Sequence, residues 1–200
     1  MKLPITTLLP ALALASASPI ARETYPIHSS RHLFTRQDVQ TSINASLPNV
    51  TIFATGGTIA SQGSSNTQTV GYSVGLGVEA LIDAVPEILS ISNIAGYQTS
   101  NVDSGSINET ISLALAHSIT AELAKDEVAG VVVIHGTDSL EETAFFLEMT
   151  VNSTKPVVVV GAMRPATALS ADGPLNLLQA VTLASSANAR GRGIMISLNE

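Results

Sequence analysis

Apolar and polar positions alternate with two different periods along residues 49–200, and this alternation predicts strands and helices in turn. Short runs rich in Val and Ile indicate strands. Such runs lie at Val50–Ala54, in pieces within Ile88–Val102 on either side of a break at Gly96, and at Val131–Ile134, Val157–Val160 and Gly193–Leu198. Unbroken aliphatic runs of this kind are typical of parallel strands that helices cover on both faces.

The segments between these runs carry the period of helices. One stripe of apolar side chains precedes the Val131–Ile134 run, and a second stripe follows it. The stripes consist of Ile111, Leu115, Ile119 and Leu123, and of Leu140, Ala144, Leu147 and Val151. Ser106 and Glu109 form a capping box, which predicts where the first of these helices begins.

Two further helices complete the pattern. Gly77–Val85 resembles a short helix closed by a proline. Pro174 suits the first turn of a last helix, whose inward side chains would be Leu175, Leu178 and Val181. Because strands and helices alternate, the sequence predicts an α/β fold, a doubly wound parallel sheet with right-handed crossovers.

The residues before this body have a different character. Met1–Ala17 combines one lysine, a short apolar stretch and small residues at its end, which is the pattern of a signal peptide. Residues 18–48 are polar and interrupted by prolines, so we interpret them as a disordered linker or propeptide. His28 and His32 could form a weak metal site there, but no further ligand stands at suitable spacing, and the linker interpretation is preferred.

Glycosylation sequons support the same view of the amino terminus. Four Asn-X-Ser/Thr triplets occur, at Asn44, Asn49, Asn108 and Asn152. Asn49 leads directly into a predicted strand, so we expect it to be unmodified. Together with the signal peptide, the sequons predict a secreted glycoprotein of the extracellular space or cell wall.

Composition narrows the classes of function. The 9 basic and 16 acidic residues give a formal charge of -7, which argues against a nucleic-acid surface. The amino-terminal apolar run is too short to cross a membrane, so no membrane span is expected. The absence of cysteine excludes disulfides, thiolate metal sites and cysteine nucleophiles, so a nucleophile would have to be a hydroxyl. We expect neither a metal nor a cofactor.

Polar, glycine-containing segments follow the predicted strands. They are Thr55–Thr58, Val102–Ser104, His135–Asp138 and Gly161–Pro165. Because the carboxyl ends of parallel strands share one edge, these segments are expected to meet where such sheets bind ligands. This coincidence favours an enzyme.

Each segment also has a plainer interpretation. The two glycines before Thr58 permit a tight turn near a ligand, but the same stretch could be a degenerate dinucleotide loop. Thr137 and Asp138 could be a nucleophile–base or ligand-binding pair, or could only cap a helix together with Ser139. His135 could be a general base, although a structural hydrogen-bonding role is favoured. Arg164 could bind a carboxylate or brace its own loop.

Four motifs in order carry a family resemblance. They are Thr55–Ala60, the His-Gly-Thr-Asp sequence within Gly130–Leu140, Val160–Pro165 and Ser170–Asn176. On these motifs the chain from Leu47 to Glu200 resembles the asparaginase/glutaminase family of the bacterial secreted type and looks like a fungal member.

The resemblance implies roles for individual residues. Thr58 matches the nucleophile that forms an acyl-enzyme with the side-chain amide and releases ammonia. Tyr72, within the lid Ser61–Gly75, matches the tyrosine that assists it. Thr137 and Asp138 match a second catalytic pair.

Substrate contacts follow from the same resemblance. Asp138 and Ser104 match residues that hold the α-amino and α-carboxylate groups, and Ala162 matches a backbone contact near the reacting amide. Two positions depart from the family pattern. Gly105 stands where glutamine is usual, so one substrate hydrogen bond is in doubt, and Ser139 replaces a more usual threonine.

The resemblance further implies parts beyond residue 200. The lysine that completes the Thr137 pair would fall about ten residues past Glu200, followed by a smaller α/β domain that serves a neighbouring subunit. We therefore expect residues 49–200 to be the incomplete N-terminal catalytic domain of an asparaginase, a tetramer when whole.

The sequence leaves three readings of function. The first is an amidohydrolase acting on L-asparagine, with L-glutamine as a second candidate, which takes a small amino-acid amide as its partner. The second is a truncated, inactive fragment or pseudoenzyme. A nucleotide-binding protein is a distant third. A related amidotransferase that acts on charged tRNA is disfavoured by the signal peptide.

Overall fold

The computed structural model describes residues 39–41, 43–68 and 70–199, which all belong to one compact unit, His32–Glu200. The predicted signal peptide, residues 18–38 of the predicted linker, His28 and His32 lie outside the described residues. No described helix has both the length and the apolar character needed to span a bilayer.

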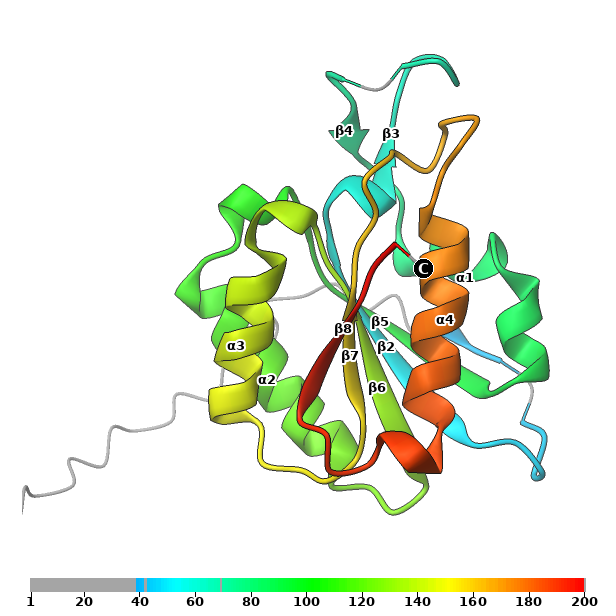
Figure 1. Ribbon diagram of the computed structural model, residues 1–200, viewed down its shortest axis with the longest axis vertical. Helices are drawn as coiled ribbons and strands as arrows, with labels where there is room; N and C mark the ends of the chain where they lie inside the picture. Colours follow the sequence, from blue (N-terminus) through cyan, green and yellow to red (C-terminus); the bar gives the residue numbers. More distant parts are fainter. Residues whose placement is uncertain (1–38, 42, 69, 200) are drawn as a thin grey trace, which may run out of the picture. The chain divides into compact units, whose positions relative to one another are not determined.

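A six-stranded sheet with the order β1-β5-β2-β6-β7-β8 forms the centre of this unit (Figure 1). Its strands are β1 (Val39–Gln40), β2 (Asn49–Gly56), β5 (Asn93–Val102), β6 (Val128–Ile134), β7 (Val157–Val160) and β8 (Ile194–Ser197). All neighbours are parallel except β1, which runs antiparallel to β5. A separate two-stranded ribbon pairs β3 (Ser61–Gln62) with β4 (Ser73–Val74).

Helices cover both faces of the sheet, which confirms the predicted doubly wound α/β fold (Figure 1). One face carries α1 (Val78–Asp83) and α4 (Gly173–Ser185), and the other carries α2 (Glu109–Leu123) and α3 (Leu140–Thr150). Short 3-10 turns are η1 (Thr58–Ala60), η2 (Pro86–Ser90), η3 (Ser104–Ser106), η4 (Thr137–Ser139) and η5 (Ala187–Ala189).

The unbroken aliphatic strands divide their side chains between two cores. Along β6, Val131 and Val133 pack with α2 and α3, whereas Val132 and Ile134 pack with α1 and α4. Successive side chains of a strand point to opposite faces, so a strand buried on both faces needs apolar residues at every position.

The predicted start of α2 is wrong. Ser106 belongs to η3, and Asn108 is the N-cap, whose side-chain oxygen accepts a hydrogen bond from the Ile111 amide at 3.0 Å. The Ser106 amide instead donates to the Asp103 carbonyl at 2.9 Å, so the η3 turn occupies the residue that the capping box would need.

The predicted break at Gly96 is also wrong, since β5 continues through it from Asn93 to Val102. A Cβ at Gly96 would stand 2.8 Å from Cδ1 of Ile82 on α1. The glycine therefore lets a helix approach the strand closely, which is a second common reason for glycine inside a strand.

In α4 the predicted inward face is rotated. Leu175 is 41% exposed and Leu178 half-buried, while Val181 is buried as expected. Asn176 and Leu177 face inward instead, because the Asn176 amide is buried and donates to the Gly161 carbonyl at 3.0 Å. A polar anchor thus sets the rotation of the helix.

The folded region begins earlier than the linker prediction placed it. Val39 and Gln40 pair with β5 as an edge strand. Asn93 then holds the following turn, since its amide donates to the carbonyls of Asn44 and Leu47 at 3.0 and 3.1 Å and its side-chain oxygen accepts from the Asn44 amide at 2.8 Å. The described residues 39–48 therefore belong to the fold.

Candidate active site

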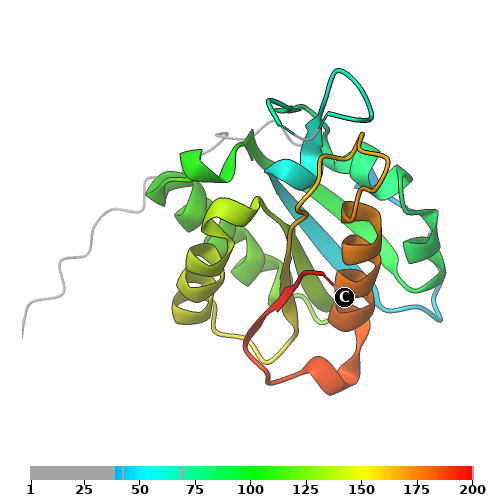
Figure 2. The same cartoon turned by 45° about the horizontal axis from the view of Figure 1, so that its top comes forward.

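The strand order places a switch point between β2 and β6. From β2 the chain passes to β5 on one side and then returns to β6 on the other. Ligands of open parallel sheets bind outside the carboxyl ends of the strands at such a point. The loops that follow β2, β5, β6 and β7 gather at this edge, called the rim below (Figure 2).

Glycine backbones bring three of these loops into direct contact. A Cβ on Gly57 would lie 2.2 Å from Cα of Gly136, and a Cβ on Gly136 would lie 2.6 Å from Oγ of Ser104. Gly57 also has a φ of 82°, a conformation that residues with a side chain rarely adopt. Thr58, Ser104 and Thr137 each lie at this contact or one residue beyond it, which confirms that their segments meet.

Thr58 begins η1 directly after the glycine turn. Its Oγ1 lies 3.4 Å from the hydroxyl of Tyr72, and both side chains are half-buried. Tyr72 immediately precedes β4, whose pairing with β3 brings it back over the start of η1. The structure thus brings together the two residues that the family resemblance pairs, although they are 14 positions apart.

Ser104 and Asp138 are also brought together, but through the backbone. Oγ of the buried Ser104 accepts a hydrogen bond from the Asp138 amide at 3.1 Å, and Oγ of Ser139 donates to the Ser104 carbonyl at 2.9 Å. The carboxylate of Asp138 is exposed at the rim. Within the part of the chain that the structure describes, it and the Thr137 hydroxyl have no hydrogen-bond partner.

The helix-capping alternative for this segment is not what the structure contains. Ser139 is the N-cap of α3 by position, yet its side chain makes no capping hydrogen bond. Its hydroxyl serves the contact with Ser104 instead. The polar groups of this segment therefore hold the rim together or face solvent.

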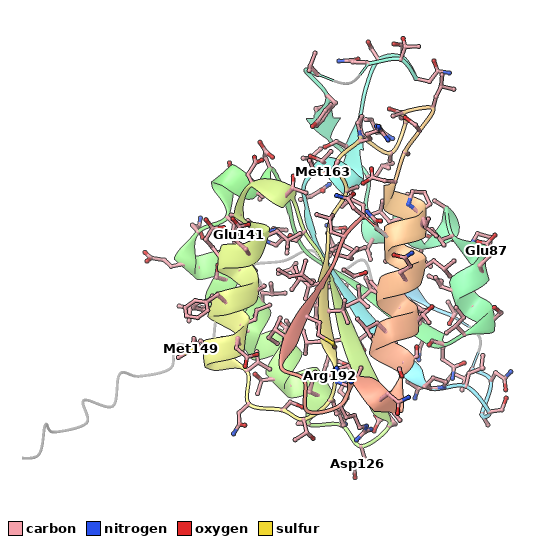
Figure 3. The ribbon with its side chains drawn as sticks, in the orientation of Figure 1. Glu87, Asp126, Glu141, Met149, Met163 and Arg192 are labelled. Carbon is pink, nitrogen blue, oxygen red and sulfur yellow. The ribbon has the colours of Figure 1, made fainter. Side chains whose placement is uncertain are left out.

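Ala162 lies fully buried in the loop between β7 and α4. Asp172 holds that loop, since its two carboxylate oxygens accept hydrogen bonds from the amides of Met163 at 2.8 Å and Arg164 at 3.0 Å. The Arg164 guanidinium donates to the Ser170 carbonyl at 3.1 Å, which supports the loop-bracing alternative for this residue. Figure 3 shows Met163 at the rim and Asp126 at the opposite end of the sheet.

His135 has the structural role that the sequence favoured. The ring is fully buried, with Nδ1 2.7 Å from the Gly136 carbonyl and Nε2 2.9 Å from Oγ1 of Thr143. A neutral ring satisfies both contacts by donating from Nδ1 and accepting at Nε2. Burial lowers the pKa of His135 below its ordinary value, which favours the neutral ring that both contacts require.

Two further observations concern metal ligands and the position of Gly105. Among residues 39–41, 43–68 and 70–199, no group of three His, Cys, Asp or Glu side chains could hold a metal ion. A Cβ at Gly105 would meet nothing within 4 Å, so the position that departs from the family pattern borders open space.

Sequence reasoning undervalued two residues of this region. Asp172 lies within the Ser170–Asn176 motif, which by itself gave this residue no role, whereas in the structure its carboxylate holds the loop that carries Ala162. The signal available was a carboxylate directly before the Gly173-Pro174 start of a predicted helix. Thr167 was not singled out, and no local pattern marks it, because its hydroxyl accepts from the Gly63 amide 104 positions away.

Comparison with known proteins gives one consistent family. A family model described as Asparaginase, N-terminal, matches residues 49–200. The chain is 61% identical over 160 residues to the Probable L-asparaginase 1 of Schizosaccharomyces pombe, a match that covers 80% of this chain and 44% of that protein. It is 52% identical over 153 residues to the Glutaminase-asparaginase of Acinetobacter glutaminasificans, with 76% and 46% covered.

A solved structure agrees with the fold described above. The crystal structure of a probable cytoplasmic L-asparaginase from Campylobacter jejuni superimposes with a TM-score of 0.74 at 45% identity, covering 76% of this chain and 46% of that one. The chain therefore spans less than half the length of the curated relatives it matches.

Proposed function

The chain belongs to the asparaginase family, and from this membership we propose that its rim site hydrolyses the side-chain amide of L-asparagine to L-aspartate and ammonia. The observation that carries the proposal is the hydroxyl pair of Thr58 and Tyr72, 3.4 Å apart at the switch point of the sheet. A weakly acidic hydroxyl becomes a nucleophile when a neighbouring group can accept its proton.

The proposed reaction has two steps. Oγ1 of Thr58 attacks the amide carbon and its proton passes toward Tyr72; the carbon–nitrogen bond then breaks, and the nitrogen leaves with that proton as ammonia. The product of this step is an ester between Thr58 and the substrate. Water hydrolyses the ester in the second step, which releases L-aspartate and returns the hydroxyl to Thr58.

Ser104 and Asp138 suit the charged end of an amino acid. Because Oγ of Ser104 already accepts from the Asp138 amide, its own proton is free to donate to a carboxylate. The exposed Asp138 carboxylate supplies a negative charge for the α-ammonium group. The Thr137 methyl group would lie 3.2 Å from a Cβ at Gly161, so Thr137 adjoins the start of the loop that carries Ala162.

L-Glutamine is the second candidate substrate, because one relative is named a Glutaminase-asparaginase. We further propose that the protein is secreted and glycosylated, which the Met1–Ala17 pattern and the four sequons support. Family resemblance supports a homotetramer in which subunits complete one another's sites.

Ammonia release tests the nucleophile. It is measured on L-asparagine and L-glutamine with the protein translated from its complete gene, as wild type, Thr58→Ala, Thr58→Ser and the control Thr182→Ala, an exposed threonine on α4. Loss of a nucleophile costs about a thousandfold or more in kcat. We expect that loss in Thr58→Ala, partial activity in Thr58→Ser and wild-type rates in the control.

Two outcomes would contradict the proposal. Equal turnover by wild type and Thr58→Ala would remove Thr58 from the mechanism. A folded wild type that releases no ammonia from either amide would favour the inactive, pseudoenzyme reading.

A further inference from the structure

The residues around β3 and β4 form an arm that stands above the rim, here called the flap and defined as residues 61–68 and 70–75. Figures 1 and 2 both show it beside the loop that joins β7 to α4. Three hydrogen bonds join the two segments. The Ala166 amide donates to the Ser61 carbonyl at 2.9 Å, and the Leu169 amide donates to the Asn66 carbonyl at 3.1 Å.

The third bond is made by a side chain. Oγ1 of Thr167 accepts a hydrogen bond from the Gly63 amide at 2.9 Å. Near its own base the flap is attached to Gly57, Thr58 and Ala60, and Tyr72 contacts Thr58. Among the described residues, its other hydrogen bonds to the rest of the chain all go to this one loop. The loop is therefore the outer support of the flap.

The loop is itself anchored at its far end. Asp172 binds the Met163 and Arg164 amides, and Asn176, which is buried on α4, donates both to Asp172 at 3.2 Å and to the Gly161 carbonyl. A charged acceptor that binds two backbone amides makes stronger hydrogen bonds than a neutral one. The loop between these anchors and the flap is thereby held to the first turn of α4.

A continuous path of contacts leads from this anchor to the nucleophile. It runs from Asp172 through the loop to Thr167, then across to Gly63, along the pairing of Ser61 with Val74 and Gln62 with Ser73, and ends at Tyr72 beside Thr58. A displacement of the loop would move the Tyr72 hydroxyl relative to Oγ1 of Thr58. A misplacement of about 1 Å between reacting groups can lower the rate of catalysis by roughly a hundredfold.

We propose that Thr167 and Asp172 are positioning residues, which hold the flap where Tyr72 reaches Thr58. The proposal rests on the proposed function only for the catalytic meaning of the Thr58–Tyr72 pair. The mechanical part of the proposal is that the loop supports the flap, and this claim concerns the folded chain alone. Asp172 makes no hydrogen bond to a described residue of the flap, and the proposal requires that it still controls the exchange protection of flap amides through the loop.

Residue-resolved amide hydrogen exchange tests the mechanical part. The variants are Asp172→Asn, Thr167→Val, Thr167→Ser and the control Glu87→Gln, an exposed carboxylate on η2 that Figure 3 places away from the flap. We expect Asp172→Asn to accelerate exchange at Met163 and Arg164 and also at Gly63 by about fivefold, the ratio that corresponds to one net hydrogen bond.

The hydrogen bond from the Gly63 amide to Oγ1 of Thr167 is here called the brace. The threonine variants distinguish a specific effect of this bond from a general loss of local stability. Thr167→Val removes the acceptor at nearly constant volume, so Gly63 and the neighbouring Leu169 amide should both exchange about fivefold faster. Thr167→Ser keeps the hydroxyl and should behave as wild type, as should Glu87→Gln. The proposed role of the brace is overturned if Asp172→Asn changes the exchange rates of only the Met163 and Arg164 amides, or if Thr167→Val changes that of Gly63 alone. If Asp172→Asn does not fold, the two Thr167 variants decide the question.

Binding of L-aspartate, the proposed product, tests the catalytic part. We expect Thr167→Val to weaken its affinity about fivefold and Thr167→Ser to restore it. Equal affinities in wild type and Thr167→Val would overturn a positioning role of the brace. A wild type that does not bind L-aspartate would reject the proposed function instead, and the exchange data would still judge the brace.

Discussion

At the residue scale, the absence of a side chain at two glycines sets the geometry of the rim. Gly57 and Gly136 approach so closely that a methyl group on either would overlap the backbone or the Ser104 side chain. Positions such as Gly105 and Gly191 have no neighbour within 4 Å of the place of a Cβ. Glycine is therefore required for close packing at Gly57 and Gly136, whereas packing places no such requirement on Gly105.

This difference predicts opposite results for two alanine substitutions. Gly57→Ala should lower the free energy of unfolding by roughly 2–4 kcal/mol, because it adds overpacking to an unfavourable positive φ. Gly105→Ala should change it by less than about 0.5 kcal/mol, since the position is exposed and open. Urea denaturation measures both, and similar losses in the two variants would contradict the packing argument.

At the element scale, the period of the sequence predicts which segments are helices but not their ends or rotation. The stripes of α2 and α3 were confirmed, with Leu115, Ile119 and Leu147 buried. The N-cap of α2 was misplaced by two residues, because a rim turn uses Ser106. In α4, hydrogen bonds from Asn176 to the β7–α4 loop turned Leu175 outward.

The corrected start of α2 can be tested with a pair of alanine variants. Asn108→Ala should destabilise the protein by about 1 kcal/mol, because the Ile111 amide loses its acceptor. Ser106→Ala is the matched control and should cost less than about 0.5 kcal/mol. A larger loss for Ser106→Ala than for Asn108→Ala would restore the capping box. Unglycosylated material is required for this measurement, since Asn108 lies in a sequon.

At the scale of the whole molecule, the described fold begins before the residue where the aliphatic pattern starts. The pairing of β1 with β5 and the bonds of Asn93 join residues 39–48 to the sheet. An edge strand of two residues, Val39 and Gln40, is too short to show a hydrophobic period, so sequence patterns do not reveal it. Asn93 is 8% exposed and would lose buried partners without this segment.

The proposed export of the protein has a measurable consequence at this scale. If Met1–Ala17 is a signal peptide, amino-terminal sequencing of the protein recovered from the medium or cell wall should begin at Ser18. Replacing Leu8 and Leu9 by Gln and Asn should retain the protein inside the cell, because the apolar stretch is what the export machinery binds. An intact Met1 on extracellular protein would contradict the proposal.

The amino-acid pattern alone was enough to predict which segments are strands and helices and which segments carry candidate chemistry. Periodicity depends on side chains within a few residues of one another, so strands such as Val157–Val160, the stripes of α2 and α3, and the loops after each strand can be read directly. The absence of cysteine excluded a thiol nucleophile, and the family resemblance that the four motifs carry implied Thr58.

Which of these groups come into contact depends on how the chain folds. The contact of Gly57 with Gly136, the bond between Ser104 and the Asp138 amide, and the support of the flap by Thr167 join residues that are 34 to 104 positions apart. Such contacts follow from the order of the strands and from distances of a few ångströms between backbones. Neither leaves a periodic trace along the chain, because each depends on how whole elements pack.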